Sequence, residues 1–381
     1  MKPARTLALA ALLLVAAVVG PGTAAASTTA QSDCGFPYTA TDATGTEVTV
    51  DEAPQTVAAL QPSDAQTMWE IGARDQVVAM PQNQYTGYLN DTEGKTNVAN
   101  SDGSTNVEAV VGSGPDVVLA ANVTSADTVQ QLRDAGLTVY HFPLVDSIDG
   151  IYEQTETIGR LTGNCAGASE SVSAMQERVQ RVEDAVADRE SPRVLYYSYG
   201  FTTGSGSHIH DMIQTAGGTN VAAQANLTGY AEINTELVVQ QDPQWFLLAS
   251  GAPAPSGAPY NETTAMQENQ TLRVNANYLS QPAPRFVTAL ETMAEAFHPD
   301  AFAEQTETTV TTTTETVTTT ETTVTTDATQ TTETTVDATT TTADGTTTTP
   351  ITSSDGPGFG LSAAVLALVG TLLVAARRKG T

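Results

Sequence analysis

The chain has 381 residues, of which 43 are acidic and 15 basic, so its formal net charge is -28. An acidic surface of this kind repels the nucleic-acid backbone, which excludes nucleic acid as a partner. The middle of the chain, residues 27–305, is long enough for one two-lobed protein or for two small domains.

Residues 1–26 are predicted to be a secretory signal peptide. Two cations precede an apolar run from Leu7 to Val19, and small residues follow up to a cleavage point near Ala26. No cysteine lies at the cleavage point, so we do not expect a lipid anchor there. The mature protein is therefore expected to work outside the cytoplasm.

Residues 27–164 are predicted to form an N-terminal α/β lobe. Short apolar runs alternate with helical segments, which is typical of a mainly parallel sheet with helices on its faces. A hairpin is expected at 38–41 and 47–50. Further strands are expected at 57–60, 77–80, 116–120 and 138–142. One helix is expected to end near residue 72, and three others are expected to span 106–111, 126–135 and 147–161.

Residues 165–191 are predicted to form one long amphipathic helix, ended by Ser191-Pro192. Its apolar positions recur at steps of three and four, with charged residues between them: Val172, Met175, Val179, Val182 and Val186. Because similar α/β segments lie on both sides, we predict a rigid backbone helix joining two lobes. The alternative is an ordinary core helix inside one domain.

Residues 192–305 are predicted to form a C-terminal lobe that repeats the pattern less regularly. Strands are expected at 194–197 and 245–248, and helices at 208–216, 237–240 and 284–297. In sheets of this kind ligands bind beyond the carboxyl ends of the strands. Amide and aromatic side chains dominate those positions, with few charges.

Residues 306–355 are almost entirely threonine with scattered acids, a composition that predicts a disordered, hydroxyl-rich stalk. Residues 356–381 follow with Pro357-Gly358-Phe359, an apolar run and a basic end. This order of parts resembles the archaeal PGF-CTERM sorting signal, which implies removal of the tail and attachment of a lipid. A retained short membrane helix is the alternative. With the acidic, lysine-poor composition, the tail looks haloarchaeal, and either reading places the protein on the outer face of the membrane.

The two cysteines, Cys34 and Cys165, are even in number in an exported chain, so a disulfide is expected. Five Asn-x-Thr sequons predict glycosylated surface loops: Asn90, Asn122, Asn226, Asn261 and Asn269. His208 and His210 make a poor metal pair, so no metal site is expected. A triad of Ser205, His208 and Asp211 has unsuitable spacing, so we expect no enzyme and no cofactor.

Residues 45–300 resemble the helical-backbone substrate-binding proteins of ABC importers that deliver vitamin B12 and iron complexes. The first-lobe motifs are Gln61-Pro62-Ser63, Trp69 to Gly72, Asn106 to Val111, Pro115 to Val118, Ala135 to Val139 and Ile158 to Leu161. The second-lobe motifs are Gly204-Ser205-Gly206, Met212-Ile213, Ala216 to Val221, Glu236-Leu237, Asp242-Pro243 and Pro284-Arg285.

The resemblance implies two lobes joined by one long helix, with ligand held between them. It also implies that one surface glutamate on each lobe docks onto arginines of the importer's membrane subunits; by motif these are Glu108 and Glu236. Their alternative role is that of helix-start acids favoured by the helix dipole. The implied partners are a small molecule, the permease and its ATPase, and the protein is expected to be a monomer.

For the ligand site the resemblance points to Gln61, Ser63, Tyr85, Tyr199, Phe201, Tyr230 and Arg285. Flat aromatic faces suit a corrin, so cobalamin or a related corrinoid is the expected ligand. Members of the family that bind vitamin B12 have tryptophan near the position of Tyr230, so this chain departs there from the family pattern that favours cobalamin. A ferric siderophore or haem is the alternative, and those that are anionic demand cations, of which only Lys95, Arg273 and Arg285 are candidates. A structural or adhesive surface protein is the alternative from a different class.

Overall fold

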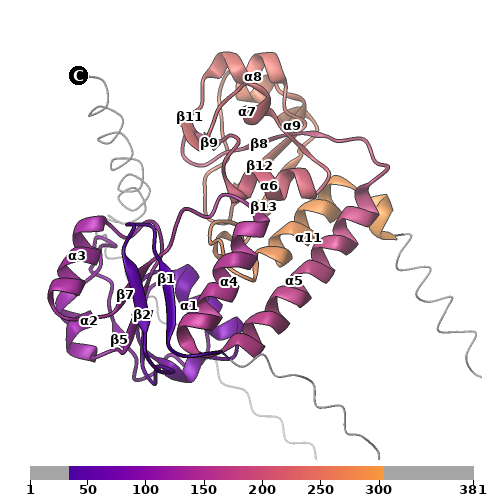
Figure 1. Ribbon diagram of the computed structural model, residues 1–381. Helices are drawn as coiled ribbons and strands as arrows, with labels where there is room; N and C mark the ends of the chain where they lie inside the picture. Colours follow the sequence, from indigo (N-terminus) through magenta and orange to yellow (C-terminus); the bar gives the residue numbers. More distant parts are fainter. Residues whose placement is uncertain (1–33, 304–381) are drawn as a thin grey trace, which may run out of the picture. The chain divides into compact units, whose positions relative to one another are not determined.

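The computed structural model describes residues 34–303, so the predicted signal peptide, stalk and sorting signal lie outside the described residues. Within them, two mainly parallel sheets are flanked by helices, which confirms the predicted α/β class (Figure 1). Across residues 34–303, no helix has both the length and the apolar content that crossing a membrane requires.

The N-terminal sheet has five parallel strands, and both of its faces are buried. In spatial order they are β5 (Thr96–Asn97), β4 (Val77–Met80), β3 (Val57–Ala59), β6 (Val117–Ala120) and β7 (Val139–His141). Val117 and Leu119 belong to one core cluster, whereas Val118 and Ala120 belong to another. Because successive side chains of a strand point to opposite faces, such all-apolar strands require cover on both sides. The cover includes α1 (Pro62–Glu70), α2 (Val107–Ser113) and α3 (Ala126–Asp134).

The hairpin of β1 (Tyr38–Thr41) and β2 (Glu47–Val50) is tied to this lobe through the buried Asp42. The Asp42 carboxylate forms an ion pair with Arg133 and accepts the backbone N–H of His141. Burial acts to raise the pKa of Asp42, but the hydrogen bonds from Thr44, His141 and Arg133 outweigh it and lower the pKa.

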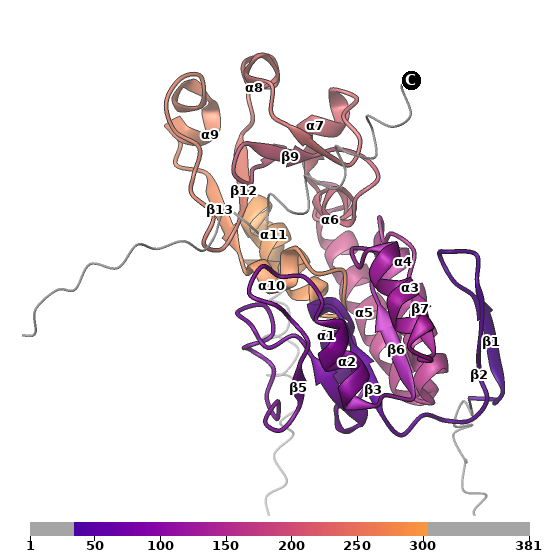
Figure 2. The same ribbon diagram turned by 90° about the vertical axis from the view of Figure 1, so that its left-hand side faces the viewer.

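The C-terminal sheet has four parallel strands, flanked by a small antiparallel pair. The sheet order is β10 (Thr219–Asn220), β8 (Arg193–Tyr196), β12 (Trp245–Ala249) and β13 (Thr271–Val274), and the pair is β9 (Phe201–Thr203) with β11 (Tyr230–Glu232). The α-helices of this lobe are α6 (His208–Thr215), α7 (Val221–Gln224), α8 (Thr235–Gln241), α9 (Thr264–Gln267), α10 (Ala276–Leu279) and α11 (Phe286–Phe297), seen from a second side in Figure 2. Each lobe also has one short 3-10 helix, η1 (Arg74–Gln76) in the N-terminal lobe and η2 (Tyr260–Glu262) in the C-terminal lobe.

The long helix α5 (Cys165–Val186) packs against α4 (Ile148–Thr162) as an antiparallel pair. All five predicted apolar positions of α5 are buried. The helix ends at Val186, a few residues before the expected end, and residues 187–190 are exposed. No apolar side chain there packs on a core, so the helix gains nothing by continuing.

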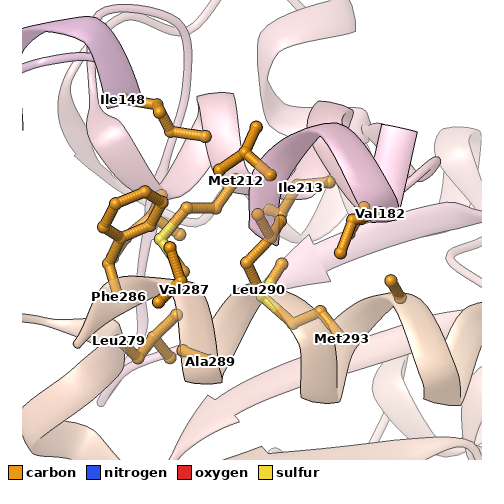
Figure 3. Packing of buried hydrophobic residues seen from close by; sticks show 14 of the residues in the cluster. Ile148, Val182, Met212, Ile213, Leu279, Phe286, Val287, Ala289, Leu290 and Met293 are labelled. Atoms are coloured by element: carbon orange, nitrogen blue, oxygen red, sulfur yellow. The ribbon is translucent and has the colours of Figure 1, made fainter. Parts of the chain in front are cut away.

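The α4 and α5 pair contributes to the cores of both lobes. Ile151 near the start of α4 joins the C-terminal core, whereas Ile158 and Leu161 near its end join the N-terminal core. In α5 the direction is reversed, since Ala168 lies in the N-terminal core and the later valines lie in the C-terminal one. Figure 3 shows Val182 of α5 among the α6 and α11 side chains of that core.

Two glycines allow the close approach of helices at this junction. A Cβ added to Gly159 of α4 would lie 2.4 Å from Cβ of Ala168, and one added to Gly167 of α5 would lie 2.1 Å from the carbonyl oxygen of Ile71, just after α1. Both distances are far below van der Waals contact, so only glycine fits. At the same end of α5, Cys165 forms a disulfide with Cys34, with the two Cα atoms 5.7 Å apart.

Candidate functional site

The candidate site lies at the carboxyl ends of the two parallel sheets. In the N-terminal lobe the chain leaves β3 at Gln61, β4 at the 81–90 loop, β6 at Ala121 and β7 at Phe142. Because β3, β4, β6 and β7 are parallel, these exits share one edge of the sheet. In the C-terminal lobe, β8, β12 and β13 end at Tyr196, Ala249 and Val274 on the corresponding edge.

The turn after β3 is fixed by a fully buried carboxyl group, Asp64. One oxygen of Asp64 accepts the backbone N–H of Gln61 (3.2 Å) and that of Ala121 (3.2 Å), which joins the turns after β3 and β6. The other oxygen has no hydrogen-bond partner among the described residues. Burial raises the pKa of Asp64 to about 7, although the two N–H groups act to lower it. The predicted ligand residues beside it differ in exposure, since Gln61 is partly exposed and Ser63 is buried.

Tyr85 lies in the loop after β4 of the N-terminal lobe. This loop contacts the segment between α10 and α11 of the C-terminal lobe. The Gln281 side chain donates to the carbonyl oxygen of Tyr85 (2.9 Å). The side chain of the buried Gln66 of α1 donates to the side-chain oxygen Oε1 of Gln281 (3.0 Å) and to the Tyr88 hydroxyl (2.6 Å). Burial raises the pKa of Tyr88 to about 12, so its hydroxyl stays protonated and can donate to Gln281. A polar network thus connects the loop that carries Tyr85 to both lobes.

We expect Gln66→Leu to lower the free energy of unfolding by about 1–3 kcal/mol, because it removes the acceptor of the part-buried Arg285 N–H and one of the donors to the buried Gln281 side chain. Denaturant unfolding at neutral pH measures the difference. Gln214→Leu, at an exposed glutamine of α6, is the matched control and is expected to change stability little. Equal losses in the two variants would contradict the role of the network.

Arg285 lies at the same junction but its charge is already paired. Its Nε donates to Glu70 of α1 (2.7 Å), and its guanidinium lies 5.1 Å from the ring centroid of Tyr88. Burial acts to lower the pKa of Arg285, but the Glu70 carboxylate outweighs it and raises the pKa. The structure therefore assigns this cation a contact between the lobes, and its role as a ligand contact stays a prediction.

The aromatic residues predicted for the C-terminal lobe lie together beyond β8. Tyr199 and Gly200 form the turn between β8 and β9, both with positive φ (50° and 87°). A tyrosine with positive φ lies in the left-handed region of backbone conformation, where its side chain makes the backbone strained, and such strain is concentrated at functional sites. Tyr230 pairs with Thr203, two residues from Phe201, so Tyr230 and Phe201 are diagonal neighbours on one face of the β9 and β11 pair.

Tyr230 is 50% exposed, yet desolvation by the surrounding protein, with a smaller contribution from Tyr196, raises the pKa of its hydroxyl. Tyr199 is 38% exposed. Large aromatic surfaces left open in this way are available to a flat ligand.

Two apolar residues at the N-terminal edge were missed by sequence reasoning. Val123, after β6, is 55% exposed, and Leu144, after β7, is 64% exposed. They belong to the few large hydrophobic residues that stay exposed in the described chain, together with Tyr199 and Tyr230 at the other edge. The sign that could have found them is an apolar residue just beyond the end of a buried strand.

Glu108 and Glu236 occupy equivalent, exposed places in the two lobes. Each is the second residue of a short helix, α2 and α8, after an asparagine N-cap. The side chain of Asn106 accepts the N–H of Ala109 (3.0 Å), and that of Asn234 accepts the N–H of Glu236 (2.9 Å). Both carboxylates are therefore held at the surface by short, capped helices.

Other candidate chemistry finds no support at this site. Lys95 donates to the carbonyl oxygens of Arg74 and Val77 at the amino end of β4, which is the end of the strand away from the site. The prediction of Lys95 as a candidate cation of the ligand site is therefore wrong. Within residues 34–303, no three His, Cys, Asp or Glu side chains are grouped to hold a metal. Ser205, His208 and Asp211 bond to Leu227, Leu279 and Ile148, respectively, so they do not form a proton relay.

Comparison with known proteins gives a consistent picture. Residues 57–277 match the family described as periplasmic binding protein. A cobalamin-binding protein of Halobacterium salinarum is 44% identical over 379 residues, covering 95% of this chain and 94% of the relative. The crystal structure of the periplasmic vitamin B12 binding protein of Vibrio cholerae is similar in fold, with a TM-score of 0.56 at 22% identity, covering 64% of this chain and 97% of that one. A periplasmic heme-binding protein of Roseiflexus is similar with a TM-score of 0.58 at 19% identity, covering 65% and 99%.

Proposed function

This chain belongs to the periplasmic binding protein family, and from that premise we propose that it captures cobalamin or a related corrinoid and delivers it to an ABC importer. Ligand is held between the carboxyl edges of the two sheets. The protein supplies no reaction chemistry of its own; it binds, carries and releases.

The observation that carries the choice of ligand is the similarity, over nearly the whole chain, to a relative described as binding cobalamin. The site geometry supports it. Apolar and aromatic surface lies open at both edges, from Val123 and Leu144 on one lobe to Tyr199 and Tyr230 on the other. Of the three candidate cations, Arg285 is paired with Glu70, Lys95 lies at the amino end of β4, and Arg273 donates to the carbonyl oxygen of Ala252. A large, flat ligand without strong negative charge suits this combination.

The two surface carboxylates support the delivery step. Glu108 and Glu236 would each meet a cation of the importer's membrane subunits, which sets the orientation of docking more than its strength. The predicted C-terminal anchor would keep the protein at the outer face of the membrane, close to the importer. The finer parts of this proposal are the ligand residues Gln61, Ser63, Tyr85, Tyr199, Phe201, Tyr230 and Arg285, and the monomeric state.

A thermal-shift screen in high salt tests the ligand. We expect cobalamin and cobinamide to raise the unfolding temperature, because a ligand that binds only the folded state stabilises it by mass action. Tyr230→Ala is expected to weaken that stabilisation, and Tyr230→Phe, the matched control, to retain most of it because the aromatic face remains. A shift with haem or a ferric siderophore instead would overturn the corrinoid assignment. No shift with any of them would favour another ligand or a structural or adhesive protein.

A further inference from the structure

A short segment around each docking glutamate is repeated in the two lobes at identical spacing. The first runs from Asn106 to Pro115, and the second from Asn234 to Pro243. Each has an asparagine N-cap, a glutamate at the second helical position and two consecutive valines, and each helix ends at a residue in the left-handed conformation followed by proline.

The two segments also occupy the same place in the topology. Helix α2 leads into β6, which pairs with the first strand of its sheet, β3. Helix α8 leads into β12, which pairs with the first strand of the C-terminal sheet, β8. The repeat is therefore a structural equivalence and not a chance similarity of composition.

The two valines of each segment have opposite environments. Val110 and Val238 are completely buried, as a helix that packs on a sheet requires. Val111 and Val239 are 38% and 62% exposed. Each exposed valine follows its glutamate by three residues, so the two side chains share one face of the helix. Single exposed hydrophobic residues are common and need no explanation, but the same residue beside the same carboxylate in both lobes does.

We propose that Val111 and Val239 are contact residues for the importer, each forming with Glu108 or Glu236 a docking pad of one carboxylate and one apolar side chain. The inference rests on the proposed function. The occupant is the importer's membrane subunits, which must then present a cation next to an apolar surface at two places.

The position of the valines argues for this occupant, because each lies on the same helix face as a glutamate to which the proposed function gives a docking role. The carboxylates steer and orient, but salt screens exposed ion pairs within a few ångströms at molar concentrations. An apolar contact is not screened and is strengthened by salts that are excluded from protein surfaces. The valines therefore supply the part of the docking affinity that survives high salt.

The test measures binding of the full-length protein to the ABC importer of the same organism, in lipid nanodiscs, at low and at molar salt. We expect Val111→Thr with Val239→Thr to weaken binding on the order of tenfold at both salt concentrations. Glu108→Gln with Glu236→Gln should weaken binding mainly at low salt. Val111→Ile with Val239→Ile is the matched control and should bind like the wild type, because the side chains stay apolar. All variants should keep the stabilisation by corrinoid.

Three outcomes would overturn the inference. Equal binding of the threonine and wild-type proteins would remove the valines from the contact while leaving the importer role intact. No binding of the wild-type protein to the importer would overturn the proposed function itself. Sedimentation that shows a wild-type dimer dissociated by the threonine variant would assign these faces to a second copy of the chain.

Discussion

Removing the disulfide is expected to lower the free energy of unfolding by about 4–5 kcal/mol. Cys34 and Cys165 are 131 residues apart, so in the unfolded chain the bond closes a long loop and removes much of its conformational freedom. Denaturant unfolding of Cys34→Ser with Cys165→Ser, compared with the wild type, measures the loss.

The reduced wild-type protein is the control that separates loop closure from side-chain packing. Reduction and the double substitution should cost the same within experimental error if loop closure dominates. A loss below about 1 kcal/mol in both would show that the segment around Cys34 is held by its other contacts alone. Those include the β1 and β2 hairpin, which Asp42 and Arg133 tie to the lobe independently of the bond.

The buried carboxyl of Asp64 is expected to make stability fall as the pH rises through 7. Its pKa is about 7 in the folded protein and about 3.9 in the unfolded chain, so folding favours the protonated form. The resulting stabilisation is fully present below about pH 4, is lost progressively as the pH rises towards 7, and amounts to about 4 kcal/mol in all. Unfolding free energies measured at several pH values between 4 and 8 report it.

Asp64→Asn is the matched variant, because its amide stays neutral and can still accept a backbone N–H from Gln61 or Ala121. We expect this variant to lack the fall in stability between pH 4 and 7, while other titrating groups act on both proteins alike. Parallel pH profiles of the two proteins would show that Asp64 is ionised throughout and that its two N–H partners suffice to hold the charge.

Elements with a repeating apolar pattern and clear end signals could be predicted from the sequence. The apolar stripe of α5 is one example, since its period lies within the helix itself, and β4 and β6 are others, because each is a continuous apolar run between turn signals. The two-residue strands β5 and β10 could not, because two residues show no period and gain their pairing only from a neighbouring strand. The end of α5 was placed too late because helix propensity does not reveal where the supporting core stops.

The candidate site shows the same division. Glu108 and Glu236 were predicted from family motifs, and the fold places both at exposed, equivalent helix starts, whereas their docking role stays a prediction. The pairing of Gln66 with Gln281, 215 residues apart, has no local sign, because each is only a polar residue in an ordinary segment until the fold brings them together. The repeat of Asn, Glu and two valines does have a sign in the sequence, because it appears when the two halves of the chain are aligned on Asn106 and Asn234.

The helices α4 and α5 have a consequence for how this protein could be divided. One end of each helix packs in the N-terminal core and the other end packs in the C-terminal core. A cut before, between or after the two helices therefore leaves neither half with a complete hydrophobic core. A fragment ending at Thr162 would carry the start of α4 as an uncovered apolar surface, and one beginning at Cys165 would lack the α4 residues that complete its own core. A lobe exchanged between relatives would therefore keep a complete core only if the helical pair fits both the new lobe and the old one.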